Sequence, residues 1–196
     1  MKLFISLIIL LTMMQQHNNK MEEVVLGEGC FWCSEAIFKE LNGIHEVTPG
    51  YAGGSIKNPT YDEVCTGETG HAEVVKIKYD PETVPFEKIL EVFFSTHDPT
   101  SHNRQGADIG TQYRSVIFYT TEEQEKKSRE IIVKLNNSKI YQKPIVTELK
   151  KLPEFYKAES YHQNYYANNK NKAYCQLVIQ PKLKKFEEIF KGYLKK

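Results

Sequence analysis

The sequence predicts an α+β fold in which a mixed, mainly antiparallel sheet and its flanking helices form a two-layer sandwich. Alternating polarity, as in residues 71–79, indicates strands, and apolar residues at helical spacing, as in residues 86–94, indicate amphipathic helices. Hairpin-like neighbours interrupt the strand–helix alternation that a doubly wound parallel sheet would need. At 196 residues, the chain is long enough for one domain with a sizeable core.

The first half of the chain alternates between strand and helix signals. Residues 22–29 predict a strand and residues 34–41 a helix, whose buried face carries apolar residues at every fourth position. The next elements are an extended segment at 44–51, a short helical segment at 61–65, a strand at 71–79 and a helix from Pro85. In the strand at 71–79, Ala72 and Val74 are expected on one face and Glu73 and Val75 on the other.

The second half begins with a polar loop at 97–110, and long ordered loops on compact domains often carry function. A strand is predicted at 113–119, and Thr121 with Gln124 forms a capping-box pattern before a charged helix. The remaining segments are a short strand at 145–149, mixed helix and loop at 154–169 and an amphipathic helix at 182–194.

The first twenty residues differ in composition from the rest. A lysine at position 2 precedes a short apolar run, a pattern typical of a signal peptide or an N-terminal anchor. We therefore expect residues 1–20 to direct export to the periplasm or the cell exterior or to anchor the chain at the membrane, and a chain without such a signal would be cytoplasmic. Residues 21–196 are expected to form the functional domain. The formal net charge of +1 gives no reason to expect a nucleic-acid partner.

Four cysteines at positions 30, 33, 65 and 175 are too few for a disulfide scaffold, and they lack the paired spacing of a structural zinc site. Cys30 lies where the first strand passes into a helix N-terminus, which favours negative charge. A lowered pKa and a nucleophilic thiol are therefore expected there. Phe31 and Trp32 beside it suggest an apolar wall for a substrate.

Six motifs in order resemble those of the peptide methionine sulfoxide reductase A family, over roughly residues 23–175. They are Gly29-Cys30-Phe31-Trp32, Asn58-Pro59-Thr60-Tyr61-Asp62-Glu63-Val64-Cys65, Gly67 with Thr69-Gly70-His71-Ala72-Glu73, His97-Asp98-Pro99-Thr100, Gln105-Gly106-Ala107-Asp108-Ile109-Gly110-Thr111-Gln112-Tyr113-Arg114-Ser115 and Tyr161-His162-Gln163. The resemblance implies a ferredoxin-like α+β core with a long irregular C-terminal segment. It also implies reduction of methionine-S-sulfoxide, free and in proteins, to methionine.

The resemblance implies a cysteine mechanism. Cys30 would attack the sulfoxide sulfur and become a sulfenic acid, a species that condenses with a second thiol. Cys175 matches a resolving position, while Cys33 stays open as a second exchange partner or as a packing residue. A thioredoxin-like dithiol would recycle the disulfide, and no bound cofactor or metal and a monomeric chain are expected.

The other site roles also follow from the resemblance. Glu73 would protonate the leaving oxygen, which requires an apolar site that raises its pKa. Tyr61 and Tyr113 would donate hydrogen bonds to the same oxygen. The remaining expected substrate-binding residues are Asp108, His71, Phe31 and Trp32, the last two holding the methyl group.

Two other functions remain open at this point. A thioredoxin-like oxidoreductase could use the Cys30-Phe31-Trp32-Cys33 pair, although the tryptophan lies inside that pair and the parallel strand pattern is missing. A non-enzymatic binding module could use Phe31 and Trp32 as a recognition patch.

Overall fold

The computed structural model describes residues 21–195 and contains a six-stranded sheet of order β7-β6-β1-β3-β2-β8. All neighbouring strands are antiparallel except β6 and β7, which are parallel. The predicted mixed, mainly antiparallel sheet is therefore confirmed. The strands are β1 Glu22–Glu28, β2 Ile44–Ala52, β3 Ala72–Tyr79, β6 Ser115–Tyr119, β7 Glu148–Lys151 and β8 Phe155–Lys157.

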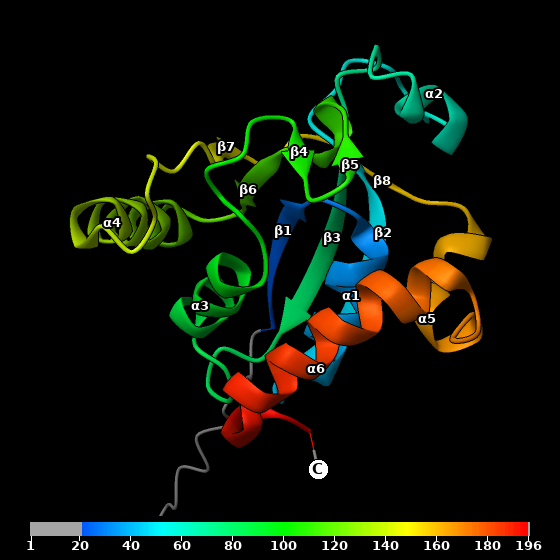
Figure 1. The fold of residues 1–196 in the computed structure, drawn as a ribbon. Coiled ribbons are helices and arrows are strands. Elements are labelled where there is room, and N and C mark those ends of the chain that lie inside the picture. The colour runs from blue at the N-terminus through cyan, green and yellow to red at the C-terminus, as the bar shows by residue number, and fades with distance from the viewer. Residues whose placement is uncertain (1–20, 196) are drawn as a thin grey trace, which may run out of the picture.

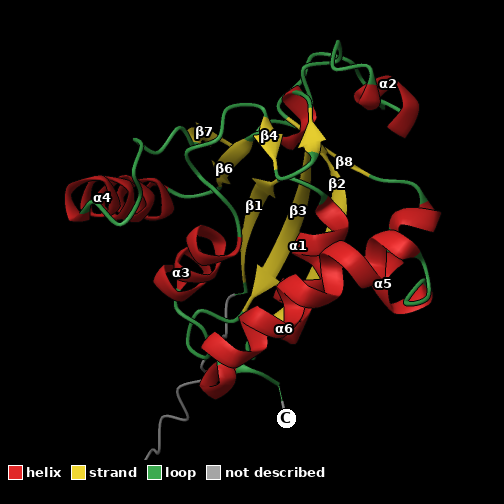
Figure 2. Ribbon diagram, in the orientation of Figure 1, coloured by secondary structure: helices red, strands yellow, loops and turns green. Residues whose placement is uncertain are grey.

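Helices cover one face of this sheet (Figure 1). The helices α1 (Phe31–Glu40), α3 (Phe86–Thr96) and α6 (Gln180–Ile189) contribute their apolar sides to the main core, together with β1 and β3, and α6 packs on α1 and α3. The longer α4 (Glu122–Ser138) lies beside α3, and Lys127 Nζ pairs with Glu87 Oε1 at 2.9 Å across the two helices. Figure 2 shows the resulting layer of helices over the strands.

The opposite face of the sheet carries a smaller apolar cluster. Ala72 and Val74 belong to it, whereas Val75 and Ile77 belong to the main core, so β3 presents alternate residues to the two faces as predicted. Glu73 has the parity of Val75 and Ile77, which places its side chain on the face that the helices cover.

A tight junction connects β1 to α1. Gly29 has φ +95°, and a Cβ at this position would lie 2.6 Å from Cβ of Gln105, so both the backbone angle and the space favour glycine. Cys30 is the N-cap, and its carbonyl accepts a hydrogen bond from the backbone N–H of Cys33 at 3.1 Å. The helix therefore begins at Phe31, three residues before the predicted start.

Several elements differ from the predictions because long-range contacts create them. The polar loop holds a small hairpin of β4 (Arg104–Gln105) and β5 (Asp108–Ile109), and Tyr113 closes a 3₁₀ helix, Thr111–Tyr113, instead of starting β6. The strand predicted at 145–149 lies at 148–151, and β8 was not predicted. Both are edge strands that form by pairing with β6 and β2, and their own sequences carry little strand signal.

The C-terminal part of the chain is irregular only in places. The helix α5 (Tyr165–Asn168) lies in the segment expected to mix helix and loop. In the first half of the chain, the short helix α2 (Tyr61–Cys65) lies where it was predicted. A π-helical turn, Cys175–Ile179, leads directly into α6. Within residues 21–195, no helix is long and apolar enough to span a membrane. The predicted signal or anchor at 1–20 lies outside the described residues.

Candidate active site

Residues from several separate segments line one cavity of about 160 Å³ at the start of α1. These residues include the predicted nucleophile, acid, phenols, aspartate and aromatic wall, and they are Cys30, Phe31, Trp32, Tyr61, Glu73, Asp108, Tyr113 and Tyr174. The sequence-predicted site residues therefore meet at one place, with His71 and the other cysteines outside this lining.

Cys30 lines this cavity and is 8% exposed. Burial raises the pKa of its thiol well above the usual value, and the neighbouring Cys33 thiol adds to the rise. The prediction of a lowered pKa was therefore wrong. A helix N-terminus stabilises a nearby charge by about 0.3–1 kcal/mol, less than one pKa unit, whereas full burial shifts a pKa by several units.

Glu73 is a buried residue that also lines this cavity. In the antiparallel pairing of β3 with β2, Glu73 lies opposite Tyr51. Glu73 Oε2 accepts a hydrogen bond from the backbone N–H of Phe31 at 3.1 Å. Burial raises the Glu73 pKa well above its usual value, and the negative charge of a Cys30 thiolate would raise it further. A carboxyl in this setting holds its proton near neutral pH and can give it to a bound oxygen atom.

Two phenols complete the polar side of the cavity. Tyr61 is the first residue of α2 and Tyr113 the last of its 3₁₀ helix, so they approach the cavity from different loops. Burial and the Glu73 charge raise the pKa of both phenols. Both therefore stay protonated, as donors that can stabilise negative charge developing on an oxygen atom.

Tyr174 is a cavity residue for which no role was predicted from the motifs. Its hydroxyl donates a hydrogen bond to Asp108 Oδ2 at 2.8 Å and also interacts with the Cys30 thiol. Asp108 lies on the small hairpin, so this bond connects the hairpin to the segment just before Cys175. The only sequence signal for Tyr174 was its position next to that cysteine.

Two aromatic residues form the apolar wall, and other rings hold them in place. The Phe31 ring lies 5.0 Å from the His162 ring between their centroids. Trp32 stacks on Tyr165 at 3.6 Å and donates its Nε1–H to His162 Nδ1 at 3.0 Å. His162 and Tyr165 thus position the wall, a role that the motif containing His162 did not reveal.

Three of the four thiols form one buried cluster. Cys33 lies one helical turn after Cys30, and the two thiols interact directly. Cys175 is fully buried in the same cluster, packed through the π-helical turn. Cys65 is exposed at the end of α2 and lies outside the cluster. All four are free thiols.

A comparison with known protein families decides between the functions left open above. Residues 22–193 match the model of the family described as peptide methionine sulfoxide reductase. The chain belongs to the peptide methionine sulfoxide reductase family. This membership confirms the predicted family and an enzyme that reduces methionine sulfoxide, and it excludes the thioredoxin-like and non-enzymatic alternatives.

Individual members of the peptide methionine sulfoxide reductase family match over most of the chain. The relative named peptide methionine sulfoxide reductase MsrA from a Nitratiruptor species is 55% identical over 173 residues, which are 88% of this chain and 98% of the relative. The solved reduced form of Mxr1 from Saccharomyces cerevisiae is 34% identical, with a TM-score of 0.74 over 79% of this chain and 89% of that one. Methionine sulfoxide reductase A of Corynebacterium diphtheriae has a TM-score of 0.73 at 38% identity, over 76% of this chain and 75% of that one. These similarities confirm the predicted fold class.

His71, predicted to bind substrate, does not line the reductase cavity. Its Nδ1 accepts a hydrogen bond from the backbone N–H of Gly54 at 3.1 Å, and its Nε2 lies 2.8 Å from the Ile56 carbonyl. Because both ring nitrogens bind the loop after β2, the residue holds that loop next to β3. Among residues 21–195, no group of three or more His, Cys, Asp or Glu side chains is arranged to hold a metal ion.

A buried carboxyl outside the reductase cavity gives a testable effect on stability. Burial raises the pKa of Glu28 from 4.5 to about 6, so the folded state holds this proton more tightly than the unfolded state. Stability from this group is therefore present at low pH and is lost as the pH rises through the range from 4.5 to 6. The loss amounts to about 2 kcal/mol at 1.36 kcal/mol per pKa unit.

We expect Glu28→Gln to remove this pH dependence. Urea unfolding at about pH 4 and about pH 7 measures the free energy of unfolding of the variant and of the parent chain. From the lower to the higher pH, the difference between the two chains should shift by about 2 kcal/mol in favour of the variant. An equal stability difference at both pH values would show that Glu28 does not titrate differently on folding.

Proposed function

We propose that the chain reduces methionine-S-sulfoxide, free and in proteins, with Cys30 as the nucleophile and Glu73 as the acid. One observation carries this assignment: a buried thiol, a buried carboxyl and two phenols line the same small cavity, beside an aromatic wall. The methyl group of the substrate would lie against Phe31 and Trp32, and its oxygen would point toward Glu73. Because these two sites fix two substituents of a chiral sulfur, the cavity favours one sulfoxide epimer.

The first step converts the Cys30 thiol into a sulfenic acid. The Cys30 sulfur attacks the sulfoxide sulfur while Glu73 gives its proton to the oxygen, and Tyr61 and Tyr113 stabilise the charge that develops there. The oxygen then passes to Cys30, where an S–O bond forms, while the bonds from the methionine sulfur to this oxygen and to Cys30 break, and methionine leaves. Glu73 recovers the proton that the thiol gave up. In sum, one oxygen passes from methionine sulfoxide to Cys30, and no proton is gained or lost. The high pKa of Cys30 suits this step because the thiol loses its proton only as the sulfoxide gains one.

The second step forms a disulfide with a neighbouring thiol. Cys33 already interacts with Cys30, and rotation of two side chains across one helical turn would bring their sulfurs together. We infer that Cys33 attacks the sulfenic acid first, with loss of water, and that Cys175 takes part in a later exchange. The sequence favoured Cys175 as the first resolving thiol. The Cys175 backbone lies in a packed helical turn, which supports a reaction of Cys175 after that of Cys33.

A thioredoxin-type dithiol is the proposed reductant. The yeast relative Mxr1 has been solved in complex with Trx2, as well as in reduced and oxidised forms. The disulfide would be returned to two thiols by exchange, and no further cofactor is needed for this chemistry. Oxidised proteins and free methionine sulfoxide are the proposed substrates, and the chain is proposed to act as a monomer.

A single-turnover experiment tests this function. Without reductant, the chain mixed with a methionine-S-sulfoxide peptide should release one methionine per chain and lose two free thiols, and the R epimer should give no release. No methionine release from the S epimer would contradict the proposed reaction. Turnover that continues without reductant would contradict the thiol mechanism.

We propose that the first twenty residues direct the enzyme out of the cytoplasm, either as a cleaved signal or as a retained anchor. The basic start and the short apolar run of residues 1–20 support this proposal. Mass spectrometry of the mature N-terminus in separated cell fractions shows whether residues 1–20 are cleaved and in which fraction the chain lies. Full-length chain recovered only from the cytoplasmic fraction would contradict export.

A further inference from the structure

The cavity residue Tyr61 is held by Glu159, which comes from a distant part of the chain. Glu159 follows β8, and its Oε1 accepts a hydrogen bond from the backbone N–H of Tyr61 at 2.8 Å, across 98 positions of sequence. Tyr61 is the first residue of α2, so its N–H has no partner inside that short helix. The reaction described so far gives Glu159 no role.

The second carboxylate oxygen of Glu159 binds the central sheet. Its Oε2 accepts a hydrogen bond from the hydroxyl of Tyr51 at 2.8 Å, and Tyr51 is a buried residue of β2. Figure 1 shows α2 at the outer end of the connection between β2 and β3, and Val64 is its only buried residue. Because α2 has little packing of its own, the bridge through Glu159 is what fixes its first residue to the sheet.

Glu159 fixes a third aromatic residue through its backbone. Its carbonyl accepts a hydrogen bond from the backbone N–H of His162 at 3.0 Å. The three residues bonded to Glu159 all place their rings around Phe31, at centroid distances of 5.9 Å for Tyr51, 6.4 Å for Tyr61 and 5.0 Å for His162. Phe31 belongs to the apolar wall and Tyr61 is a hydrogen-bond donor, so Glu159 holds the two sides of the cavity at a fixed separation.

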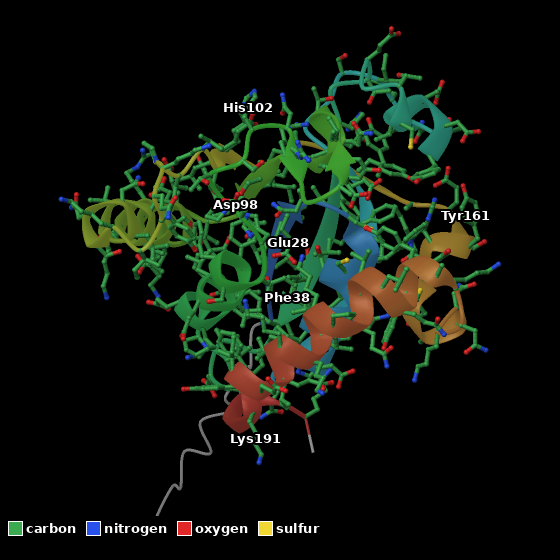
Figure 3. All side chains as sticks on the ribbon, in the orientation of Figure 1. Glu28, Phe38, Asp98, His102, Tyr161 and Lys191 are labelled. Atoms are coloured by element: carbon green, nitrogen blue, oxygen red, sulfur yellow. The ribbon has the colours of Figure 1, made fainter. Side chains whose placement is uncertain are left out.

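The segment that carries Glu159 lies at the surface. The Glu159 side chain is 32% exposed, and Tyr161, two residues later, is 60% exposed at the edge of the molecule (Figure 3). Partial burial acts to raise the pKa of Glu159, but the hydrogen bonds from Tyr61 and Tyr51 outweigh it and keep this pKa below its ordinary value. Glu159 is therefore a carboxylate at neutral pH, with both oxygens available as acceptors.

We propose that Glu159 is a positioning residue that aligns the Tyr61 hydroxyl with the sulfoxide oxygen. The inference rests on the proposed function and on Tyr61 as a donor to that oxygen. Glu159 does not line the cavity, so it acts through Tyr61. Negative charge on the oxygen grows as its bond to the methionine sulfur breaks, so the Tyr61 hydrogen bond is stronger in the transition state than in the bound substrate. Misplacement of Tyr61 therefore lowers the maximal rate of methionine release and changes substrate binding little.

Single-turnover methionine release over a range of sulfoxide-peptide concentrations tests the proposal, because it gives the maximal rate and the half-saturating concentration separately. Glu159→Ala should lower the maximal rate about tenfold, the factor for one ordinary hydrogen bond, and leave the half-saturating concentration within about threefold of the parent value. Glu159→Gln keeps a carbonyl oxygen for the Tyr61 N–H, and the Tyr51 hydroxyl can accept from its amide. This variant should therefore recover the maximal rate to within about threefold of the parent.

Dependence on the Tyr61 hydroxyl separates this role from a general loss of structure. In a Tyr61→Phe background, which has no hydroxyl to align, adding Glu159→Ala should slow release by less than about twofold. Glu154→Ala is the matched control, since Glu154 is an exposed glutamate whose Oε2 accepts a hydrogen bond from the Tyr156 hydroxyl at 2.8 Å. Tyr156 does not line the cavity, so this variant should keep the parent rate.

The possible outcomes distinguish the role of Glu159 from the reductase function. The parent rate in Glu159→Ala would overturn the role of Glu159 and leave the function intact. Equal slowing with and without the Tyr61 hydroxyl would also overturn it, because the effect would then not act through that group. The same holds if Glu159→Gln is as slow as Glu159→Ala, since the charge and not the bridge would then matter. Absence of methionine release in the parent chain would instead contradict the proposed function.

A shorter acidic side chain gives a second test if Glu159→Ala does not fold. Glu159→Asp keeps the charge but lacks one methylene group, so its carboxylate cannot reach both the Tyr61 N–H and the Tyr51 hydroxyl. The maximal rate should fall severalfold in this variant. Methionine release at the parent rate would overturn the proposal.

Discussion

Cys30→Ser is expected to abolish methionine release from a sulfoxide peptide, with a loss of at least about a thousandfold in rate. A serine hydroxyl is a weak nucleophile at neutral pH, and its oxygen cannot take up the oxygen of the sulfoxide as a sulfur atom does. The cavity itself should persist, because the Cys30 side chain makes no cap hydrogen bond at the start of α1. The measurement is methionine released per chain in a single turnover.

Cys65→Ser is the matched control for this experiment. Cys65 is exposed and lies outside the three-thiol cluster, and a serine hydroxyl can keep its hydrogen bond with Tyr61. The Cys65→Ser variant should therefore release methionine at the parent rate. Methionine release by Cys30→Ser at more than a few per cent of the parent rate would show that another group is the nucleophile.

Glu73→Gln should lower the rate of methionine release by about a hundred- to ten-thousandfold, the range for loss of a general acid. The glutamine carbonyl can still accept the hydrogen bond from the Phe31 N–H, so the geometry at the start of α1 should be kept. The amide has no acidic proton to give to the sulfoxide oxygen. Methionine release therefore falls even though the cavity still binds the substrate.

The pH profile of methionine release provides a second readout for Glu73. Burial raises the pKa of this carboxyl, and the active form is the protonated one, present below that pKa. The single-turnover rate in the parent chain should therefore fall as the pH rises through the raised pKa. Glu63→Gln changes an exposed glutamate that caps α2, and it should leave both rate and profile unchanged. A Glu73→Gln variant with the parent profile would assign the acid to another group.

The local sequence predicted the elements that carry the chemistry. Alternation in residues 71–79 placed Glu73 on the same face of β3 as the core valine at 75, and the structure confirms this. The strand-to-helix transition placed Cys30 close to the start of a helix, and the structure makes it the N-cap of α1. Both features depend on short-range periodicity, which a single sequence records well.

Features that depend on distant contacts could not be predicted in this way. Burial of Cys30 requires α6 and the π-helical turn to pack over α1, so the local pattern alone predicted the wrong direction for its pKa. The bond from Tyr174 to Asp108 spans 66 positions. Glu28 looked like a strand residue of ordinary polarity until α3 and α6 enclosed it.

The most direct test of the mechanism is to trap the oxidised sulfur itself. In a Cys33→Ser, Cys175→Ser double variant, Cys30 has no resolving partner in its cluster, so one turnover should stop at the sulfenic acid. A dimedone-type reagent followed by peptide mass spectrometry should then find the label on Cys30, in equal amount to the methionine released. Methionine release without label on Cys30, or label on Cys65 in its place, would contradict the account.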